Sequence, residues 1–183
     1  LAEERQRGTI EPLLTAPVRE GAVVLGKYLA AVLCYCALWV PTLAYTLLLR
    51  RYASFAEGAA GHLDTGPIAG AYLGTLLCGA SALALGLLCS TLTRSQVLAA
   101  ALSFSILTLL LLAGLLADLY LRSPTARAIL LYVNQFRHLD ELSRGIIDSR
   151  RLLYHLSLAA AALLVAARAL ATRPGEARRG AQT

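Results

Sequence analysis

The sequence predicts an all-α, polytopic membrane protein built as a bundle of transmembrane helices. Of its 183 residues, 57% are apolar and only 15% are charged, and the mean hydropathy is +0.62. Such a chain is more apolar than a soluble domain of this size. It also contains apolar runs long enough to cross about 30 Å of hydrocarbon at about 1.5 Å per helical residue. Because lipid offers no partners for backbone N–H and C=O groups, these runs must be helices.

The predicted spans cover residues 28–49, 67–89, 97–121 and 152–171. They make up one membrane domain, residues 28–171, which lies between an N-terminal segment, 1–27, and a C-terminal tail, 172–183. Pro41 falls near the middle of the first span, where its missing N–H and its ring predict a kink. Lys and Arg are divided almost evenly between the two sides, so charge bias does not orient the spans.

Small residues recur at every fourth position of the second span. A stripe of this kind lets another backbone approach closely and favours a right-handed helix crossing. A chance stripe in a helix rich in Ala and Gly is the alternative. The predicted packing residues are Gly70, Gly74, Cys78, Ala82 and Gly86.

Residues 124–147 predict two short helices at the outer membrane face rather than a fifth span. The second half of this segment is too polar to cross, because each charge at the bilayer centre costs about 2.5–3.5 kcal/mol. Its apolar stripe changes face near residues 137–138, which predicts a bend there. On this pattern Gln135 and Glu141 should be accessible from outside, whereas Phe136 and Leu142 should be protected. Both a brace and a substrate gate remain open as roles.

The stretch Gly21–Lys27 fits the phosphate-binding pattern G-x-x-x-x-G-K, but Tyr28 stands where a magnesium-binding Ser or Thr is needed. A true phosphate-binding loop also follows a strand and opens a soluble helix, whereas this stretch leads into a span. We therefore expect no ATP site and no cofactor in this chain.

Ser81 and His155 offer a candidate dyad for an intramembrane serine protease. If both spans enter at the same level, the two residues differ in depth by about 16 Å at 1.5 Å per residue. That distance excludes a hydrogen bond. The sequence therefore favours Ser81 as a packing residue and His155 as an interfacial one, with no catalytic residue.

No metal or nucleic-acid site is expected. His138 and Glu141, three positions apart, could share a helical face, but two ligands do not make a zinc site and no further His or Cys is close in the sequence. The net charge of +6 comes mainly from Arg scattered between apolar runs. This distribution indicates contact with a membrane surface rather than with nucleic acid.

The N-terminal segment carries the most specific motif. Gly8-Thr9-Ile10-Glu11-Pro12-Leu13-Leu14 follows an acidic and basic stretch and precedes Leu25-Gly26-Lys27. This order resembles the cytoplasmic coupling segment of ABC-2 type permeases. Residues 90–96 and the pattern Phe136-x-x-Leu139-x-x-Leu142-x-x-Gly145-Ile-Ile-Asp148 are similar to later parts of the same family. The nearest resemblance is to permeases of the gliding-motility and copper-enzyme-maturation kind.

The resemblance implies a multi-pass bacterial cell-membrane permease that acts as an exporter and takes its energy from a separate ATP-binding subunit. It implies a coupling helix with docking residues Thr9, Glu11, Leu13 and Leu14, a second permease subunit as partner, and contact with lipid. A gate would involve Phe136, Leu139, Gly145 and Asp148. Family members have six spans, so the four found here are expected to be the last four. An ion-coupled secondary transporter is the alternative, although no acidic residue lies in the middle of a span.

Overall fold

The computed structural model describes residues 20–53, 65–93 and 95–171, in which all regular structure is helical. Four stretches are long and apolar enough to cross a membrane: Gly21–Leu49, Thr65–Leu92, Gln96–Tyr120 and Ser149–Ala171. The predicted bundle of membrane helices is confirmed. In chain order the helices are α3 (Glu20–Trp39), α4 (Thr42–Ala53), α5 (Thr65–Leu92), α6 (Gln96–Tyr120), α7 (Pro124–Val133), α8 (Gln135–Ser143) and α9 (Ser149–Ala171).

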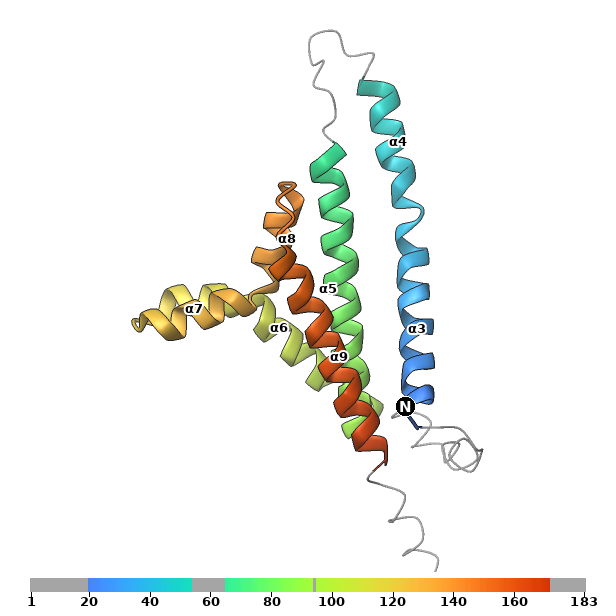
Figure 1. Cartoon of the computed structure of the whole chain (residues 1–183), viewed down its shortest axis with the longest axis vertical. Helices are drawn as coiled ribbons and strands as arrows, with labels where there is room; N and C mark the ends of the chain where they lie inside the picture. Colours follow the sequence, from blue (N-terminus) through green and yellow to red (C-terminus); the bar gives the residue numbers. More distant parts are fainter. Residues whose placement is uncertain (1–19, 54–64, 94, 172–183) are drawn as a thin grey trace, which may run out of the picture.

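The first span is interrupted where the sequence predicts a kink. Helix α3 ends at Trp39 and α4 begins at Thr42, so Val40 and Pro41 separate two helices that lie nearly end to end (Figure 1). Pro41 cannot donate a backbone hydrogen bond. The hydroxyl of Thr42 donates to the carbonyl oxygen of Trp39 at 2.6 Å, which satisfies an acceptor that the break leaves open.

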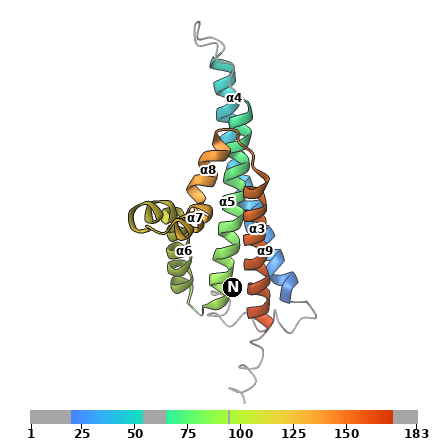
Figure 2. The same ribbon diagram turned by 60° about the vertical axis from the view of Figure 1, so that its left-hand side comes forward.

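Helix α5 lies at the centre of the bundle and contacts α3, α6, α8 and α9. Figures 1 and 2 show α9 running alongside the C-terminal part of α5, with α8 beside its N-terminal part. Helix α7 projects sideways from the bundle, between the end of α6 and the start of α8. The connection from α6 to α9 thus leaves the bundle and then returns to it.

Small side chains let α5 and α9 approach closely. Ala84 of α5 packs with Ala159 and Ala162 of α9, and all three are buried. Near the start of α3 and the end of α9, Val24 joins Ala166 in a second cluster. Without a hydrophobic drive between helices in lipid, such close packing supplies much of their attraction.

Two tyrosines fix α3 against α5. The hydroxyl of Tyr28 donates to the carbonyl oxygen of Ala80 at 3.3 Å, and that of Tyr35 donates to Thr75 at 3.0 Å. The Tyr35 ring lies directly over Gly79, where a Cβ would overlap it. Glycine at position 79 is therefore what lets this ring reach the α5 backbone.

The segment after α6 forms two short helices, α7 and α8, and they meet at Asn134. The bend predicted at residues 137–138 is wrong, because Asn134 takes an extended conformation and caps α8. Its side-chain Oδ1 accepts hydrogen bonds from the backbone N–H groups of Phe136 at 2.9 Å and Arg137 at 3.4 Å. Asparagine is among the strongest helix N-caps, and this capping explains the position of the break.

Helix α9 begins well below the start of α5. Gly145 lies beside Pro67 at the start of α5, since a Cβ there would be 3.4 Å from the Pro67 nitrogen, and its φ of 80° suits glycine. The chain then runs without helical structure to Ser149. These four steps can cover about 13 Å, which corresponds to about nine helical residues. His155, in the second turn of α9, is thereby brought to the level of Ser81.

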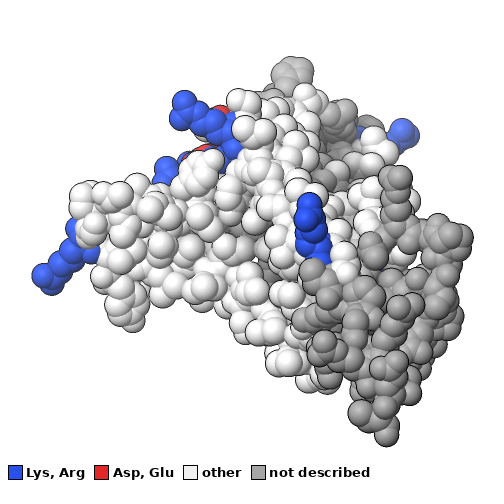
Figure 3. Space-filling view, turned by 60° about the horizontal axis from the view of Figure 1, so that its bottom comes forward, with Lys and Arg blue, Asp and Glu red and all other residues white. Residues whose placement is uncertain are grey.

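The described surface is largely uncharged. Figure 3 shows isolated Lys and Arg side chains standing out from a face made mostly of other residues. Large apolar side chains are strongly exposed on the described surface as a whole, including Leu38 at 74%, Phe104 at 73% and Val97 at 79%. A soluble monomer rarely exposes so much contiguous apolar surface, whereas lipid covers such a surface in a membrane protein.

Candidate functional site

A buried polar cluster joins α5, α8 and α9. Ser81 of α5, His138 of α8 and His155 of α9 are 0%, 0% and 1% exposed. The Ser81 Oγ lies 3.0 Å from His155 Nδ1, and His155 Nε2 lies 3.3 Å from His138 Nδ1. The other nitrogen of His138, Nε2, lies 2.9 Å from the backbone carbonyl oxygen of Tyr132. The contacts form one continuous line from α5 to the end of α7.

Aromatic rings enclose the two imidazoles. Tyr154 packs edge-to-face on His138 with centroids 4.9 Å apart, and Tyr132 packs on Tyr154 at 5.6 Å. The Tyr154 hydroxyl donates to the carbonyl oxygen of Val133 at 3.4 Å. Edge-to-face contacts of this kind add about 0.5–1.5 kcal/mol beyond area burial. The rings shield the histidines and tie α7 to α9.

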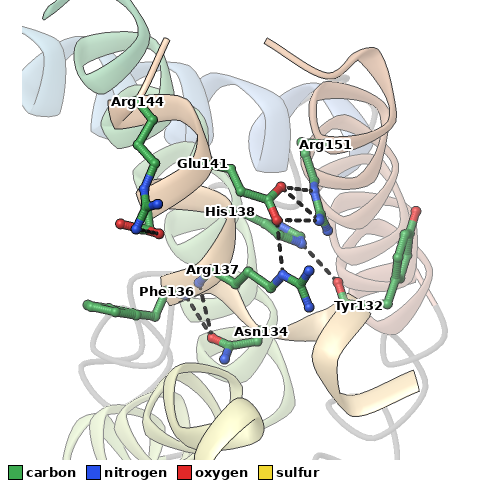
Figure 4. Close-up of polar contacts among 9 residues, drawn as sticks. Tyr132, Asn134, Phe136, Arg137, His138, Glu141, Arg144 and Arg151 are labelled. Atoms are coloured by element: carbon green, nitrogen blue, oxygen red, sulfur yellow. Dashed lines mark hydrogen bonds and ion pairs between the residues drawn. The ribbon is translucent and has the colours of Figure 1, made fainter. Parts of the chain in front are cut away.

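An ion-pair group lies next to the histidines. Glu141 of α8 binds Arg137 at 2.9 Å on its own helix and Arg151 of α9 at 2.8 Å (Figure 4). Burial raises the pKa of Glu141, but the hydrogen bonds and charges of the two arginines outweigh burial and leave its pKa below the usual value. Glu141 is therefore ionised at neutral pH and links α8 to α9.

Burial lowers the pKa of His138, and the charge of Arg151 acts in the same direction. The Tyr132 carbonyl and the Glu141 carboxylate act the opposite way, while Arg137 adds a smaller lowering effect. The net result is a pKa below the ordinary value of 6.5. His138 is thus neutral at neutral pH.

Glycines admit α8 and Asn134 to the bundle. Gly70 faces the backbone carbonyl of Leu142, and a Cβ at Gly74 would be 3.1 Å from the Leu142 side chain. On α6, a Cβ at Gly114 would overlap the amide of Asn134. Larger residues at these places would push α8 out of position, because packed interiors leave little room for added atoms.

The described part of the chain offers this cluster no set of metal ligands. Within the described ranges, no group of three or more His, Cys, Asp or Glu side chains could hold a metal ion. A separate, apolar cavity of about 500 Å³ lies between α3, α5 and α6. Its lining includes Tyr28, Ala82, Leu83, Gly86 and Leu107. This cavity suits an apolar or lipid-like occupant more than a charged one.

Comparison with known proteins decides the family. The sequence matches the family described as ABC-2 family transporter protein over residues 1–172, which is nearly the whole chain. The chain belongs to the ABC-2 transporter family. No curated protein and no solved structure gives a significant match. The prediction of a multi-pass ABC transporter permease is confirmed at this level, whereas the nearer resemblance to gliding-motility or copper-enzyme-maturation permeases stays a prediction.

The described helices of this ABC-2 protein place the residues of the α5 stripe on several neighbours. Gly70 and Gly74 lie against α8, and Cys78 Sγ lies 3.5 Å from His155 Nε2. Ala82 and Gly86 line the apolar cavity instead. The stripe therefore contacts the α8 helix and the histidine cluster at one end and the cavity at the other.

The residues predicted to form a gate differ in how far they are exposed. Leu139 Cδ1 packs 3.2 Å from the position of a Cβ on Gly74, whereas Phe136 is 63% exposed. Gly145 makes the turn after α8, and Asp148 Oδ1 accepts a hydrogen bond from the Arg150 backbone N–H at 2.9 Å. The docking residues Thr9, Glu11, Leu13 and Leu14 lie outside the described residues.

Three sequence-based interpretations of the site are wrong. Ser81 and His155 are in contact rather than about 16 Å apart in depth, because α9 starts lower than α5, and His155 is buried rather than interfacial. His138 also contacts a histidine that is distant in the sequence, His155 of α9. Gln135 is only 8% exposed rather than accessible from outside, because the face of α8 that carries Gln135, His138 and Leu142 is turned toward the bundle.

Tyr132, Asn134, Arg151 and Tyr154 were not expected at the site. One signal was present, since Arg151 and His155 stand four positions apart and so share a helical face. That face meets α8 through the Arg151–Glu141 ion pair and the His155–His138 contact. Asn134 gave a second signal as an N-cap residue between two apolar runs.

Proposed function

We propose that this chain is the membrane-spanning subunit of an ABC-2 transporter that exports a substrate across the cell membrane, with ATP hydrolysed by a separate subunit. The family match carries this proposal, because it begins at residue 1 and so includes the segment with the coupling motif. Gly21–Lys27 lies within helix α3, which gives no support to an ATP site on this chain. The ATP-binding subunit would dock on Thr9, Glu11, Leu13 and Leu14.

A second permease subunit completes the proposed transporter. In the apolar window of the stretch Gly21–Leu49, only 6% is buried by the described residues, the smallest share among the four candidate spans. Leu33 and Leu38 on this span are 68% and 74% exposed. A span so little covered by its own chain supports packing against a second copy, with lipid over the remainder.

Helix α8 is the proposed gate on the outer side. Its contacts support this role, because one face is held by Gly70 and Gly74 on α5 and the other by Arg151 and His155 on α9. The turn at Gly145 connects it to α9 and can act as a hinge. Closure of the ATP-binding subunits would be transmitted along α3 and α5 to this helix.

Protease chemistry fits the site poorly even though Ser81 and His155 are in contact. Ser81 is 0% exposed and its hydroxyl also lies 2.9 Å from the Cys78 carbonyl oxygen. His155 faces a second histidine where a catalytic dyad or triad would place an orienting carboxylate or amide. A peptide bond has no open approach to this serine. The contact favours a structural or proton-binding role.

The docking proposal is tested by co-expressing the chain with an ABC ATP-binding subunit and measuring whether the two co-purify. We expect Leu14→Asp to abolish recovery of that subunit, because it adds an unpaired charge to an apolar docking surface. Glu11→Ala should retain assembly but reduce substrate-stimulated ATP hydrolysis. Ala181→Asp adds the same charge to the C-terminal tail and is the matched control.

Normal assembly and transport by Leu14→Asp would show that the docking segment is wrongly assigned. ATP binding by the purified chain alone, measured by calorimetry and lost in Lys27→Ala, would contradict the proposal that ATP is bound and hydrolysed by a separate subunit. Uptake into inside-out vesicles that needs ATP and the partner subunit would support export.

A further inference from the structure

The protons of the His138–His155 pair can be assigned from one backbone contact. His138 Nε2 lies 2.9 Å from the Tyr132 carbonyl oxygen, and a carbonyl can only accept a hydrogen bond. Nε2 therefore carries a hydrogen. Because a neutral imidazole has a single N–H, the Nδ1 of neutral His138 must accept, and its neighbour at 3.3 Å, His155 Nε2, must donate.

The direction of the next hydrogen bond, between His155 and Ser81 of α5, follows from this assignment. With its hydrogen on Nε2, neutral His155 accepts at Nδ1 from the Ser81 hydroxyl, 3.0 Å away. The Ser81 hydroxyl also lies 2.9 Å from the Cys78 carbonyl oxygen, but it has only one hydrogen. In the neutral state the hydroxyl can satisfy only one of these two acceptors fully.

One added proton satisfies every contact in this line. His138 then donates from both nitrogens, to Tyr132 and to His155 Nε2. His155 moves its own hydrogen to Nδ1 and donates to Ser81 Oγ, which leaves the Ser81 hydrogen for the Cys78 carbonyl. A second proton would place two N–H groups face to face at 3.3 Å, in two charged rings whose centroids are 5.2 Å apart. The pair therefore has room for one proton and not two.

We propose that His138 and His155 form a binding site for a single proton, shared between α8 and α9 and connected to Ser81 of α5. Proton binding reverses the direction of the Ser81–His155 hydrogen bond. The hydrogen bonds of Ser81 on α5 therefore depend on whether the proton is bound. The proton site is independent of which substrate the transporter moves and of where ATP is hydrolysed.

Charged and titratable groups on every neighbouring element act on the site. Helix α8 contributes Glu141 and Arg137, α9 contributes Arg151 and Tyr154, α7 contributes Tyr132, and α5 contributes Cys78. Glu141 favours the added proton, whereas burial and Arg151 oppose it. The balance of these effects leaves the pKa of His138 below its ordinary value.

The experiment is nitrogen-15 NMR of the histidines in the full chain, reconstituted in lipid nanodiscs and titrated from about pH 8 to about pH 4.5 to span the ordinary histidine range. His138→Gln, His155→Gln and His62→Gln assign the signals, and His62 serves as an internal comparison. At the alkaline end we expect both members of the pair as Nε2–H tautomers. On acidification the pair should take up one proton in a single step, with His155 changing to the Nδ1–H tautomer.

Ser81→Ala and Ser105→Ala are the matched variants. Both serines donate to a carbonyl of their own helix, but only Ser81 contacts a histidine. Ser81→Ala removes the acceptor of the His155 Nδ1–H group, so the midpoint of the His138 signal should require about a tenfold higher proton concentration. Ser105→Ala should leave the midpoint unchanged.

The spectrum of the unsubstituted chain alone can overturn the proposal. Uptake of two protons by the pair within the titrated range would mean that the rings are independent. An unchanged His138 midpoint in His155→Gln would have the same meaning. Signals that move when a chelator is added would assign the pair to a metal ion instead of a proton.

Discussion

Gly70 of α5 lies directly against the backbone carbonyl of Leu142 in α8, so that a Cβ at residue 70 would overlap the carbonyl oxygen. Backbone atoms cannot move aside as a flexible side chain can. We therefore expect Gly70→Ala to destabilise the chain by about 1–3 kcal/mol. The thermal unfolding midpoint in detergent micelles measures this effect. Gly26→Ala, with nothing within 4 Å of its Cβ, should be neutral or stabilising, and equal midpoints would contradict the contact.

The Glu141 ion pairs should matter more than the neighbouring pair on the same helix. Glu141→Gln leaves Arg151, whose side chain is only 12% exposed, without its carboxylate partner. We expect a loss of about 1–3 kcal/mol, less than for a fully buried pair. Asp140→Asn breaks the exposed Arg144–Asp140 pair and should cost under about 0.5 kcal/mol. Both losses are measured as changes in the free energy of chemical unfolding. Equal values would contradict a stronger role for the Glu141 ion pairs.

Acidification should weaken the packing of α8. The pKa of His138 is lowered from 6.5 and that of Glu141 from 4.5. Each group therefore contributes stability above its unfolded pKa, and that contribution is lost as pH falls through the folded pKa. The loss begins below about pH 6.5 for His138 and below about pH 4.5 for Glu141. Unfolding midpoints measured across this range should fall, and His138→Gln should remove the first part of the decrease.

Gln135 has a buried side-chain nitrogen, Nε2, without a hydrogen-bond partner in the described residues. A buried unsatisfied donor costs about 1–3 kcal/mol, so Gln135→Met, which keeps the length of the side chain, should be neutral or stabilising. Gln96→Met, at an exposed position at the start of α6, is the control. A clear loss of stability for Gln135→Met alone would reveal an acceptor supplied from outside these residues, such as lipid or a second subunit.

Helices α7 and α8 should be reached from the same side of the membrane. Arg127 and Arg144 have side chains 54% and 68% exposed, so single cysteines at these positions should both react with an impermeant maleimide applied outside cells. The four natural cysteines would first be replaced. Labelling of the two positions from opposite sides would mean that the segment between them crosses the bilayer.

Helix positions followed from the sequence because length and hydropathy decide which segments can enter lipid. The interruption at Pro41 followed from the missing N–H. The relative depth of the helices did not follow, because it depends on the path of a few linking residues. The non-helical stretch after Gly145 shifts the start of α9 along α5. The hydrophobic periodicity of the sequence does not predict that shift.

The site was missed for the same reason. Ser81 and His155 are visible as polar residues in apolar runs, but their contact depends on where α9 starts. His138 stands among the charged residues Arg137, Asp140 and Glu141, a pattern that is typical of a solvated helix face. The side of α8 that faces inward is fixed by its contacts with Gly70 and Gly74 of α5 and His155 of α9. Tertiary packing, not local pattern, places these side chains.

The late position of α9 in the chain has a consequence for biogenesis. During synthesis, α8 leaves the ribosome before α9, so His138 and Glu141 at first lack the partners His155 and Arg151. Unpaired polar side chains at membrane depth are costly. We therefore expect the α7–α8 segment to wait at the water interface and to enter the bundle together with α9. The last helix to be made would then supply the partners that the buried polar side chains of the earlier helices need.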